Sequence, residues 1–240
     1  MNTYSLEELL DSNSYPGRGI ILGRSADNSS AVAAYFIMGR SENSRNRIFS
    51  PTLDGIRTEV ADPAKAGDPS LIIYHPVRQF VNYLIVSNGN QTDTIQHGME
   101  DGMSYFDALH SRCFEPDPPN YTPRISGVLS RDGSYVLSIL KSFYGNPACN
   151  NRYFFEYDNP QPGLGHYIHT YMGDGNPLPS FEGEPWLVKI ESPDAKSFAD
   201  LLWAHMNADN KVSLYVSYMN LATGKVDVVI TNKYESKKQQ

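Results

Sequence analysis

The chain has 240 residues, of which 40% are hydrophobic and 12% aromatic, and its formal net charge at pH 7 is −7. This composition is typical of a folded soluble protein, and the length allows one large domain with a full core. The negative charge argues against a nucleic-acid or anionic-membrane surface, because those partners require broad excess positive charge.

Targeting signals and cysteine pairs are missing from the sequence. It has no run of about 18 apolar residues and no basic start followed by an apolar stretch, so we expect a cytoplasmic protein. Cys113 and Cys149 lack the paired spacing of zinc or redox motifs and are expected to be ordinary thiols. We expect one domain over residues 1–234 and a disordered Lys/Gln-rich tail over residues 235–240.

Apolar runs in the first 90 residues predict strands. Residues 19–23 and 31–38 are joined by a polar stretch, which is the pattern of a hairpin. Residues 71–77 and 81–86 predict two more strands, and the second ends at an Asn-Gly pair. Gly89 in that pair is expected to supply positive φ for a sharp turn.

Helices and hairpins follow one another in the rest of the chain. A helical period starts at Asp93 and is expected to break near Gly102. Ser192 predicts an N-cap with Pro193 at the first helical position, and His205 in that helix is expected to be a partly buried core residue. Hairpins are predicted over residues 125–140 and 212–231, so we expect an α+β domain of antiparallel sheets covered by helices.

Two long connections contain many prolines and glycines. Residues 115–123 hold four prolines, and residues 159–185 are dense in Gly and Pro. Either segment could be a linker, but connections of this length inside a compact domain are often binding loops. Aromatic, acidic and amide side chains in the second segment favour a binding role.

Arginines are concentrated at the start of the chain. Six arginines and no lysine occur before residue 60. Arg24 or Arg57 alone would be an ordinary surface residue, but Arg40, Arg45 and Arg47 stand close together after a predicted strand. Because guanidinium groups bind phosphate or carboxylate with two parallel hydrogen bonds, this group predicts an anion site.

Three short motifs follow one another along the chain: Arg40-Ser41 with Ser44-Arg45-Asn46-Arg47, Ser87-Asn88-Gly89-Asn90-Gln91-Thr92-Asp93, and Thr122-Pro123-Arg124-Ile125. In this order and spacing they resemble the motifs of the archaeal-type IMP cyclohydrolase family. The family usually has proline where this chain has Arg45, and histidine is common at the position of Gln91.

The resemblance implies a fold, a reaction and a ligand. The fold is a four-layer αββα sandwich of antiparallel sheets like that of N-terminal-nucleophile hydrolases, without a liberated N-terminal nucleophile. The reaction is the dehydrative ring closure of 5-formamidoimidazole-4-carboxamide ribonucleotide to IMP, with no metal or other cofactor. The partner is a purine ribonucleotide, and assembly into a homo-oligomer is expected.

The resemblance also suggests catalytic roles. Arg40 and Arg47 would bind phosphate or polarise the substrate carbonyl, and Arg124 would add a positive contact. Asn88 would donate a hydrogen bond to the formyl oxygen, and Tyr74 would transfer a proton or orient the substrate.

The remaining candidate residues each have more than one possible role. Asp93 is a catalytic carboxylate or a helix N-cap. The last group would contact phosphate, base or ribose, although packing within a rigid loop is the alternative for those after residue 170. Its members are Ser41, Arg45, Asn46, Gly89, Thr92, Tyr171, Asn176, Glu182 and Glu184.

Two other functions remain open from the sequence. One is a purine-nucleotide-binding protein that keeps the fold but has lost turnover. The other is a hydrolase that acts on a related amide.

Overall fold

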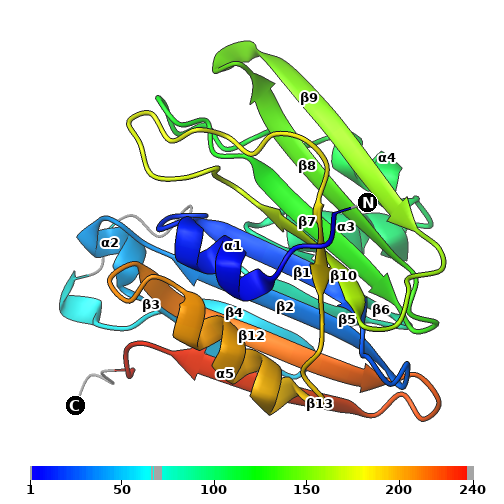
Figure 1. The fold of residues 1–240 in the computed structure, drawn as a ribbon. Coiled ribbons are helices and arrows are strands. Elements are labelled where there is room, and N and C mark those ends of the chain that lie inside the picture. The colour runs from blue at the N-terminus through cyan, green and yellow to red at the C-terminus, as the bar shows by residue number, and fades with distance from the viewer. Residues whose placement is uncertain (1, 66, 68–71, 237–240) are drawn as a thin grey trace.

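Two antiparallel sheets packed face to face form the body of the molecule (Figure 1). The computed structural model describes residues 2–65, 67 and 72–236. The predicted α+β class with antiparallel sheets is confirmed. Of the predicted disordered tail, residues 237–240 lie outside the described residues.

The first sheet has six strands within the described ranges, in the order β11-β10-β1-β2-β12-β13. Every neighbouring pair is antiparallel. The strands are β1 (Arg18–Arg24), β2 (Ser30–Met38), β10 (Leu164–His169), β11 (Trp186–Lys189), β12 (Lys211–Asn220) and β13 (Val226–Asn232).

The second sheet has seven strands in the described part of the chain, and its spatial order follows the sequence from β3 to β9. The strands are β3 (Arg47–Pro51), β4 (Gly55–Val60), β5 (Val77–Phe80), β6 (Tyr83–Ser87), β7 (Arg124–Ser130), β8 (Tyr135–Phe143) and β9 (Asn146–Tyr157).

Helices cover the outer faces of the two sheets. Side chains of α1 and α5 pack with one face of the first sheet, and those of α3 and α4 pack on the outer face of the second. The short helix α2 joins β2 to β3. The bounds are α1 (Leu6–Ser12), α2 (Glu42–Arg45), α3 (Gln91–Glu100), α4 (Tyr105–His110) and α5 (Ala195–His205), with a 3₁₀ turn over Pro63–Lys65.

Strand β2 shows how the core is divided. All nine of its residues are buried, since one face meets the helices and the other meets the second sheet. Tyr35 and Ile37 face the second sheet, whereas Phe36 and Met38 face α1 and α5. A strand buried on both faces reads as a continuous apolar run, which is why its sequence does not alternate.

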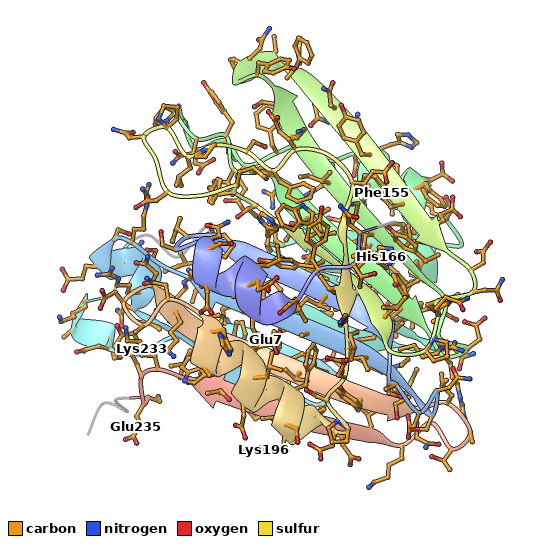
Figure 2. All side chains as sticks on the ribbon, in the orientation of Figure 1. Glu7, Phe155, His166, Lys196, Lys233 and Glu235 are labelled. Atoms are coloured by element: carbon orange, nitrogen blue, oxygen red, sulfur yellow. The ribbon has the colours of Figure 1, made fainter. Side chains whose placement is uncertain are left out.

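The core between the sheets extends to the edge strands. Phe155 of β9 packs against it, and His166 of β10 stacks on Tyr157 with 3.7 Å between ring centroids (Figure 2). Burial lowers the pKa of His166 and of His169 to about 4. Both imidazoles are therefore neutral at pH 7 and serve packing.

The three predicted hairpins are confirmed as β1–β2, β7–β8 and β12–β13. The helical region also breaks after α3, where Gly102 has φ of +79°. His205 is half-buried at the end of α5, with its Nδ1 3.0 Å from Asp11 Oδ2.

Two local predictions were wrong. Within the described residues, the strand that was predicted from residue 71 begins only at Val77. The segment before Val77 pairs irregularly with β4, because Thr58 N donates to Tyr74 O whereas Tyr74 N donates to the side-chain Oγ1 of Thr58. The N-cap of α5 is Asp194, which accepts from Ser197 N at 2.7 Å, so Pro193 lies before the helix.

Antiparallel pairing gathers several strand ends at the end of the sandwich where α2 lies, on the left of Figure 1. There β1 begins next to the end of β2, and β7 begins next to the end of β6. Strand β3 starts at the same end, directly after α2. Side chains from both sheets therefore meet at this end.

Candidate functional site

Two arginines project between the sheets at this end. Arg18 lies on the same face of β1 as Ile20 and Leu22, and Arg47 lies on the same face of β3 as Phe49; the three apolar residues belong to the core between the sheets. Arg47 is the largest fully buried side chain, with 0% exposure.

These guanidinium groups have unused donors. Arg47 Nε donates to Ser44 O at 2.8 Å and Nη2 donates to Met38 O at 3.2 Å, but Nη1 has no partner among the described residues. Arg18 Nε is likewise buried without a partner. An unsatisfied buried donor costs about 1–3 kcal/mol and more when it is charged, so this pair of arginines is suited to an anionic ligand.

The electrostatics support the same interpretation. Burial lowers the pKa of Arg47, and the charge of Arg18 lowers it further. Burial also disfavours the charge on Arg18, but Glu115, Tyr171, Tyr15 and Tyr74 more than offset this effect and raise its pKa.

Glu115 is the carboxylate of the site. It comes from the proline-rich loop before β7 and is 3% exposed. Its Oε1 lies 4.0 Å from Arg124 Nη1. Burial raises the pKa of Glu115, although Arg18, Arg124 and Arg47 oppose the shift. The carboxyl group therefore holds its proton to a higher pH than an exposed glutamate does.

Hydroxyl groups complete the surroundings of the arginines. Tyr35 and Tyr74 hydroxyls are 2.8 Å apart, and both residues lie close enough to Arg47 to interact with it electrostatically. Tyr171 is buried with its hydroxyl 2.5 Å from Thr122 Oγ1, which in turn donates to Asp117. We call Arg18, Arg47, Arg124, Glu115 and the tyrosines Tyr35, Tyr74 and Tyr171 the arginine cluster.

Arg124 is held by a chain of buried amides. Its Nη1 donates to Gln91 Oε1 at 2.8 Å, and Gln91 Nε2 donates to Asn88 Oδ1 at 2.9 Å. Asn88 also accepts from Ile125 N at 2.9 Å and donates from Nδ2 to Pro123 O at 2.8 Å. The side chain of Asn88 thus has protein partners at both ends and is fully buried.

Other residues of this motif differ from the prediction. Gly89 does not have positive φ; it is needed because a Cβ there would lie 2.5 Å from Arg124 Nη1. Thr92 is buried, and its hydroxyl contacts Ser87 Oγ. Asp93 is not the N-cap, which is Asn90, and it forms an ion pair with Arg78 at 2.8 Å. No contact joins Asp93 to the arginine cluster among the described residues.

The predicted residues around α2 form hydrogen bonds that stabilise the local backbone instead of binding to the arginine cluster. Ser41 is the N-cap of α2, and its Oγ accepts from Ser44 N. Arg45 donates to Gly39 O and to Asn210 Oδ1. The Asn46 side chain exchanges two hydrogen bonds with the backbone of Asp62.

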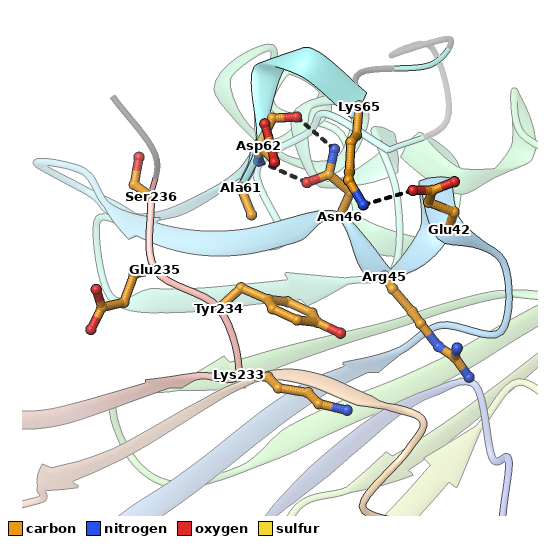
Figure 3. Close-up of a pocket in the computed structure, with 10 residues that line it drawn as sticks. All are labelled: Glu42, Arg45, Asn46, Ala61, Asp62, Lys65, Lys233, Tyr234, Glu235 and Ser236. Atoms are coloured by element: carbon orange, nitrogen blue, oxygen red, sulfur yellow. Dashed lines mark hydrogen bonds and ion pairs between the residues drawn. The ribbon is translucent and has the colours of Figure 1, made fainter. Parts of the chain in front are cut away.

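Arg45 and Asn46 line a pocket of about 700 Å³ between α2 and the segment after β13 (Figure 3). Its polar lining is already paired: Lys65 binds Glu42 at 2.8 Å, and Lys233 donates to the carbonyls of residues 208 and 209. The volume of this pocket is typical of a small-molecule site, but the pocket does not contain the unpartnered arginine donors.

The loop before β11 divides into an inner and an outer part. Tyr171 is buried within the cluster, whereas Asn176, Glu182 and Glu184 are exposed. The charge of Glu182 acts on Lys141 and that of Glu184 on Tyr157. The structure does not bring these two glutamates to the arginines.

Arg40 lies at the entrance to this end of the molecule. It forms an ion pair with Asp174, donates to Gly175 O at 2.9 Å, and has its guanidinium carbon 5.0 Å from the centre of the Tyr15 ring. Tyr15 stacks on Tyr171. Arg40 therefore joins the end of β2 to the loop that carries Tyr171.

Three members of the cluster were missed from the sequence: Arg18, Glu115 and Tyr35. Arg18 alternates with Ile20 and Leu22, so extending the first strand by one residue would have placed it on the inner face. Glu115 lies in a connection that the sequence left open as a linker or a binding loop, and no local pattern shows that this carboxylate is buried. Among the described residues, no group of three or more His, Cys, Asp or Glu side chains could hold a metal ion.

Comparisons with known proteins agree on one family. Residues 15–225 match the family model described as IMP cyclohydrolase-like protein. The chain is 31% identical over 131 residues to the IMP cyclohydrolase of Halobacterium salinarum, which covers 53% of this chain and 63% of that protein. It is 28% identical over 170 residues to the enzyme of that name from Methanopyrus kandleri, covering 69% and 79% of the two chains.

A third relative, the IMP cyclohydrolase of Methanothrix thermoacetophila, is 33% identical over 129 residues, covering 52% of this chain and 62% of that protein. The chain therefore spans somewhat less than two thirds of the Halobacterium and Methanothrix proteins that it matches.

The Gly89→Ala substitution tests whether Arg124 belongs to the ligand site. The new Cβ would lie 2.5 Å from Arg124 Nη1 and 2.7 Å from Gln91 Oε1, so it should displace the guanidinium group. We expect the affinity for IMP, measured by calorimetry, to fall about tenfold or more with little change in melting temperature, since the loss is of one charged contact. In the control Gly173→Ala, the Cβ meets nothing within 4 Å. Equal affinities for the two variants would remove Arg124 from the site.

Proposed function

The chain belongs to the IMP cyclohydrolase-like protein family, and from this premise we propose that it closes the purine ring of 5-formamidoimidazole-4-carboxamide ribonucleotide, releasing IMP and water. The observation that carries the proposal is the pair formed by the fully buried Arg47 and the half-buried Arg18. Arg47 Nη1 and Arg18 Nε are buried and have no hydrogen-bond partner among the described residues. Two like charges placed together in this way are best explained by an anionic ligand.

We propose that the ligand's phosphate lies against Arg18 and Arg47. Three arginines and one carboxylate leave the cluster with excess positive charge, although the whole chain carries −7. A phosphate group has up to two negative charges and three acceptor oxygens that can take up the open N–H groups. Arg40, which is partly exposed, would guide the nucleotide towards the cluster, and the buried Tyr171 would contact it once bound.

Arg124 and Glu115 would act at the reacting end. The carboxamide nitrogen adds to the formyl carbon, and the former formyl oxygen leaves as water after it has gained protons. Arg124 would stabilise negative charge on that oxygen, and Glu115 in its neutral form would donate a proton to it. Tyr74, fixed by its hydrogen bond to Tyr35, would orient the carboxamide.

Holding the two reacting groups in the correct geometry would supply much of the rate acceleration. Both reacting groups belong to one molecule, and well-oriented intramolecular reactions can gain about 7–11 kcal/mol from fixed geometry. An acid and an oxyanion donor then suffice, and no step requires a metal or another cofactor.

The structure changes the proposed role of Asn88. Its amide is buried and bound by Gln91, Ile125 and Pro123, so we propose that it positions Arg124 instead of donating to the formyl oxygen. Other predicted residues would also act indirectly, by stabilising the backbone that carries the cluster. They are Ser41, Arg45, Asn46 and Thr92.

Further properties follow from the family as proposals. We propose a single domain over residues 1–234 with the layer order of N-terminal-nucleophile hydrolases, which agrees with helices on both outer faces. No helix among the described residues is long and apolar enough to cross a membrane. A role in purine biosynthesis would place the chain in the cytoplasm, where a homo-oligomer is the expected form.

Incubation of the purified protein with the formamido ribonucleotide tests the proposal directly. We expect purine absorbance to appear, the activity to persist after exhaustive chelation, and Arg47→Met to lower kcat/KM at least about tenfold, because it removes a charged contact. Binding of IMP without any turnover would instead show a nucleotide-binding protein. Cleavage of other amides without ring closure would show a hydrolase.

The pH dependence of turnover tests the role of Glu115. If neutral Glu115 is the acid, kcat should fall as the pH rises through its raised pKa, and Glu115→Gln should lower kcat by about 10²–10⁴-fold and abolish that limb. Asp93→Asn, which breaks an ion pair outside the cluster, should keep the wild-type profile. A profile that Glu115→Gln leaves unchanged would exclude Glu115 as the acid.

A further inference from the structure

A second cavity lies on the outer side of the loop that carries Tyr171. Its volume is about 510 Å³, and it is enclosed by the β8–β9 hairpin, residues 119–120 and the outer part of the loop, residues 177–183. Cavities of about 300–1,000 Å³ are typical of small-molecule sites.

The loop separates this cavity from the arginine cluster. Tyr171 and Phe181 are each 1% exposed and pack into the core, so the loop presents its inner side to the cluster. Neither Arg18, Arg47 nor Arg124 lines the cavity.

Exposed aromatic rings form the rim of the cavity. Phe143 is 51% exposed, Tyr144 86% and Tyr153 44%. All three come from the β8–β9 hairpin: Phe143 and Tyr144 lie at its turn, and Tyr153 lies midway along β9. A group of exposed apolar side chains beside a cavity marks an interaction site more often than single exposed residues do.

The backbone at Tyr144 is the second, independent observation. Tyr144 and Gly145 form the two-residue turn between β8 and β9, with φ of +49° and +75°. Such turns favour Asn-Gly, because a bulky side chain in the left-handed region is strained. Tyr144 packs edge-on against Phe143 with 4.7 Å between ring centroids, but asparagine would suit the backbone better, and a strained, exposed residue beside a cavity points to a role in binding.

Polar groups in the cavity complement a planar ring with hydrogen-bonding edges. Lys141 Nζ donates to Phe181 O at 2.6 Å and lies 5.9 Å from the centre of the Tyr153 ring. Burial lowers the pKa of Lys141, and the nearby charge of Glu182 opposes that shift. Asn120 Oδ1 accepts from Leu178 N at 3.0 Å, and Asn151 Nδ2 donates to the Tyr153 hydroxyl at 3.4 Å. Asn120 Nδ2 and Asn151 Oδ1 form no hydrogen bond among the described residues, so each amide keeps one group for a ligand.

We propose that this cavity is a second ligand site, for an uncharged planar nitrogen heterocycle of the purine nucleoside class. The ring stacks against Tyr144 and Tyr153, Lys141 donates to its carbonyl oxygen, and Glu182 accepts from a ribose hydroxyl. The proposal does not depend on the ring-closing reaction, because the cavity and the arginine cluster share no residue.

Calorimetry with inosine, which has no phosphate, tests the site. We expect Tyr144→Asn to weaken inosine binding at least about tenfold, since base stacking on an aromatic ring is lost. The same change should keep or raise the melting temperature, because asparagine accepts positive φ. Tyr144→Phe should retain most of the affinity, and Tyr153→Ala should reduce it.

Two controls separate this site from the arginine cluster and from general surface effects. Arg47→Met should leave inosine binding at the cavity unchanged, and so should Tyr83→Ala, which removes an exposed tyrosine that does not line the cavity.

Three results would overturn the proposal. They are the absence of saturable inosine binding, binding that Arg47→Met removes while Tyr144→Asn does not, and a self-association in sedimentation that Tyr144→Asn abolishes while inosine has no effect. The last result would make the hairpin an interface between copies of the chain.

Discussion

The placement of two guanidinium groups between the sheets, those of the fully buried Arg47 and the half-buried Arg18, is the constraint on which the rest of the site depends. Each would be costly in an apolar core without charged or polar partners. The main-chain carbonyls of Ser44 and Met38 take two donors of Arg47, and Glu115 acts on both arginines. The N–H donors that have no partner destabilise the free protein. A bound anion would remove this cost by accepting hydrogen bonds from them.

The architecture makes this arrangement possible. In an antiparallel sandwich the strand ends of both sheets meet at one edge, so residues distant in sequence reach one another without long loops. Arg18 comes from the start of β1, Arg47 from the start of β3, and Arg124 from the start of β7. The long loops then add Glu115 and Tyr171, so the sheets supply most of the positive charge and the loops supply acid and hydroxyl groups.

Much of the fold could be predicted because apolar runs and turn residues are local signals. The hairpins of β1–β2, β7–β8 and β12–β13 follow from such signals, whereas β10 was missed inside a segment rich in Gly and Pro. Strand β3 was missed because it begins with Arg47, whose charge breaks the apolar pattern even though the side chain is buried.

The site was predicted only in part for a related reason. Clustered arginines and short motifs pointed to Arg47 and Arg124, but the motifs could not distinguish side chains that face the ligand from those that hold them. Asn88 is an example, because its role depends on hydrogen bonds to residues 91, 123 and 125 that form only in the fold. Burial of Glu115 depends on contacts with both sheets and leaves no trace in its own segment.

A crystal structure of the protein with bound IMP tests the central claim most directly. The account predicts phosphate oxygens within hydrogen-bond distance of Arg47 Nη1 and Arg18 Nε, two buried donors of the cluster that have no partner among the described residues. A nucleotide bound elsewhere, with both donors still unpartnered, would contradict the account.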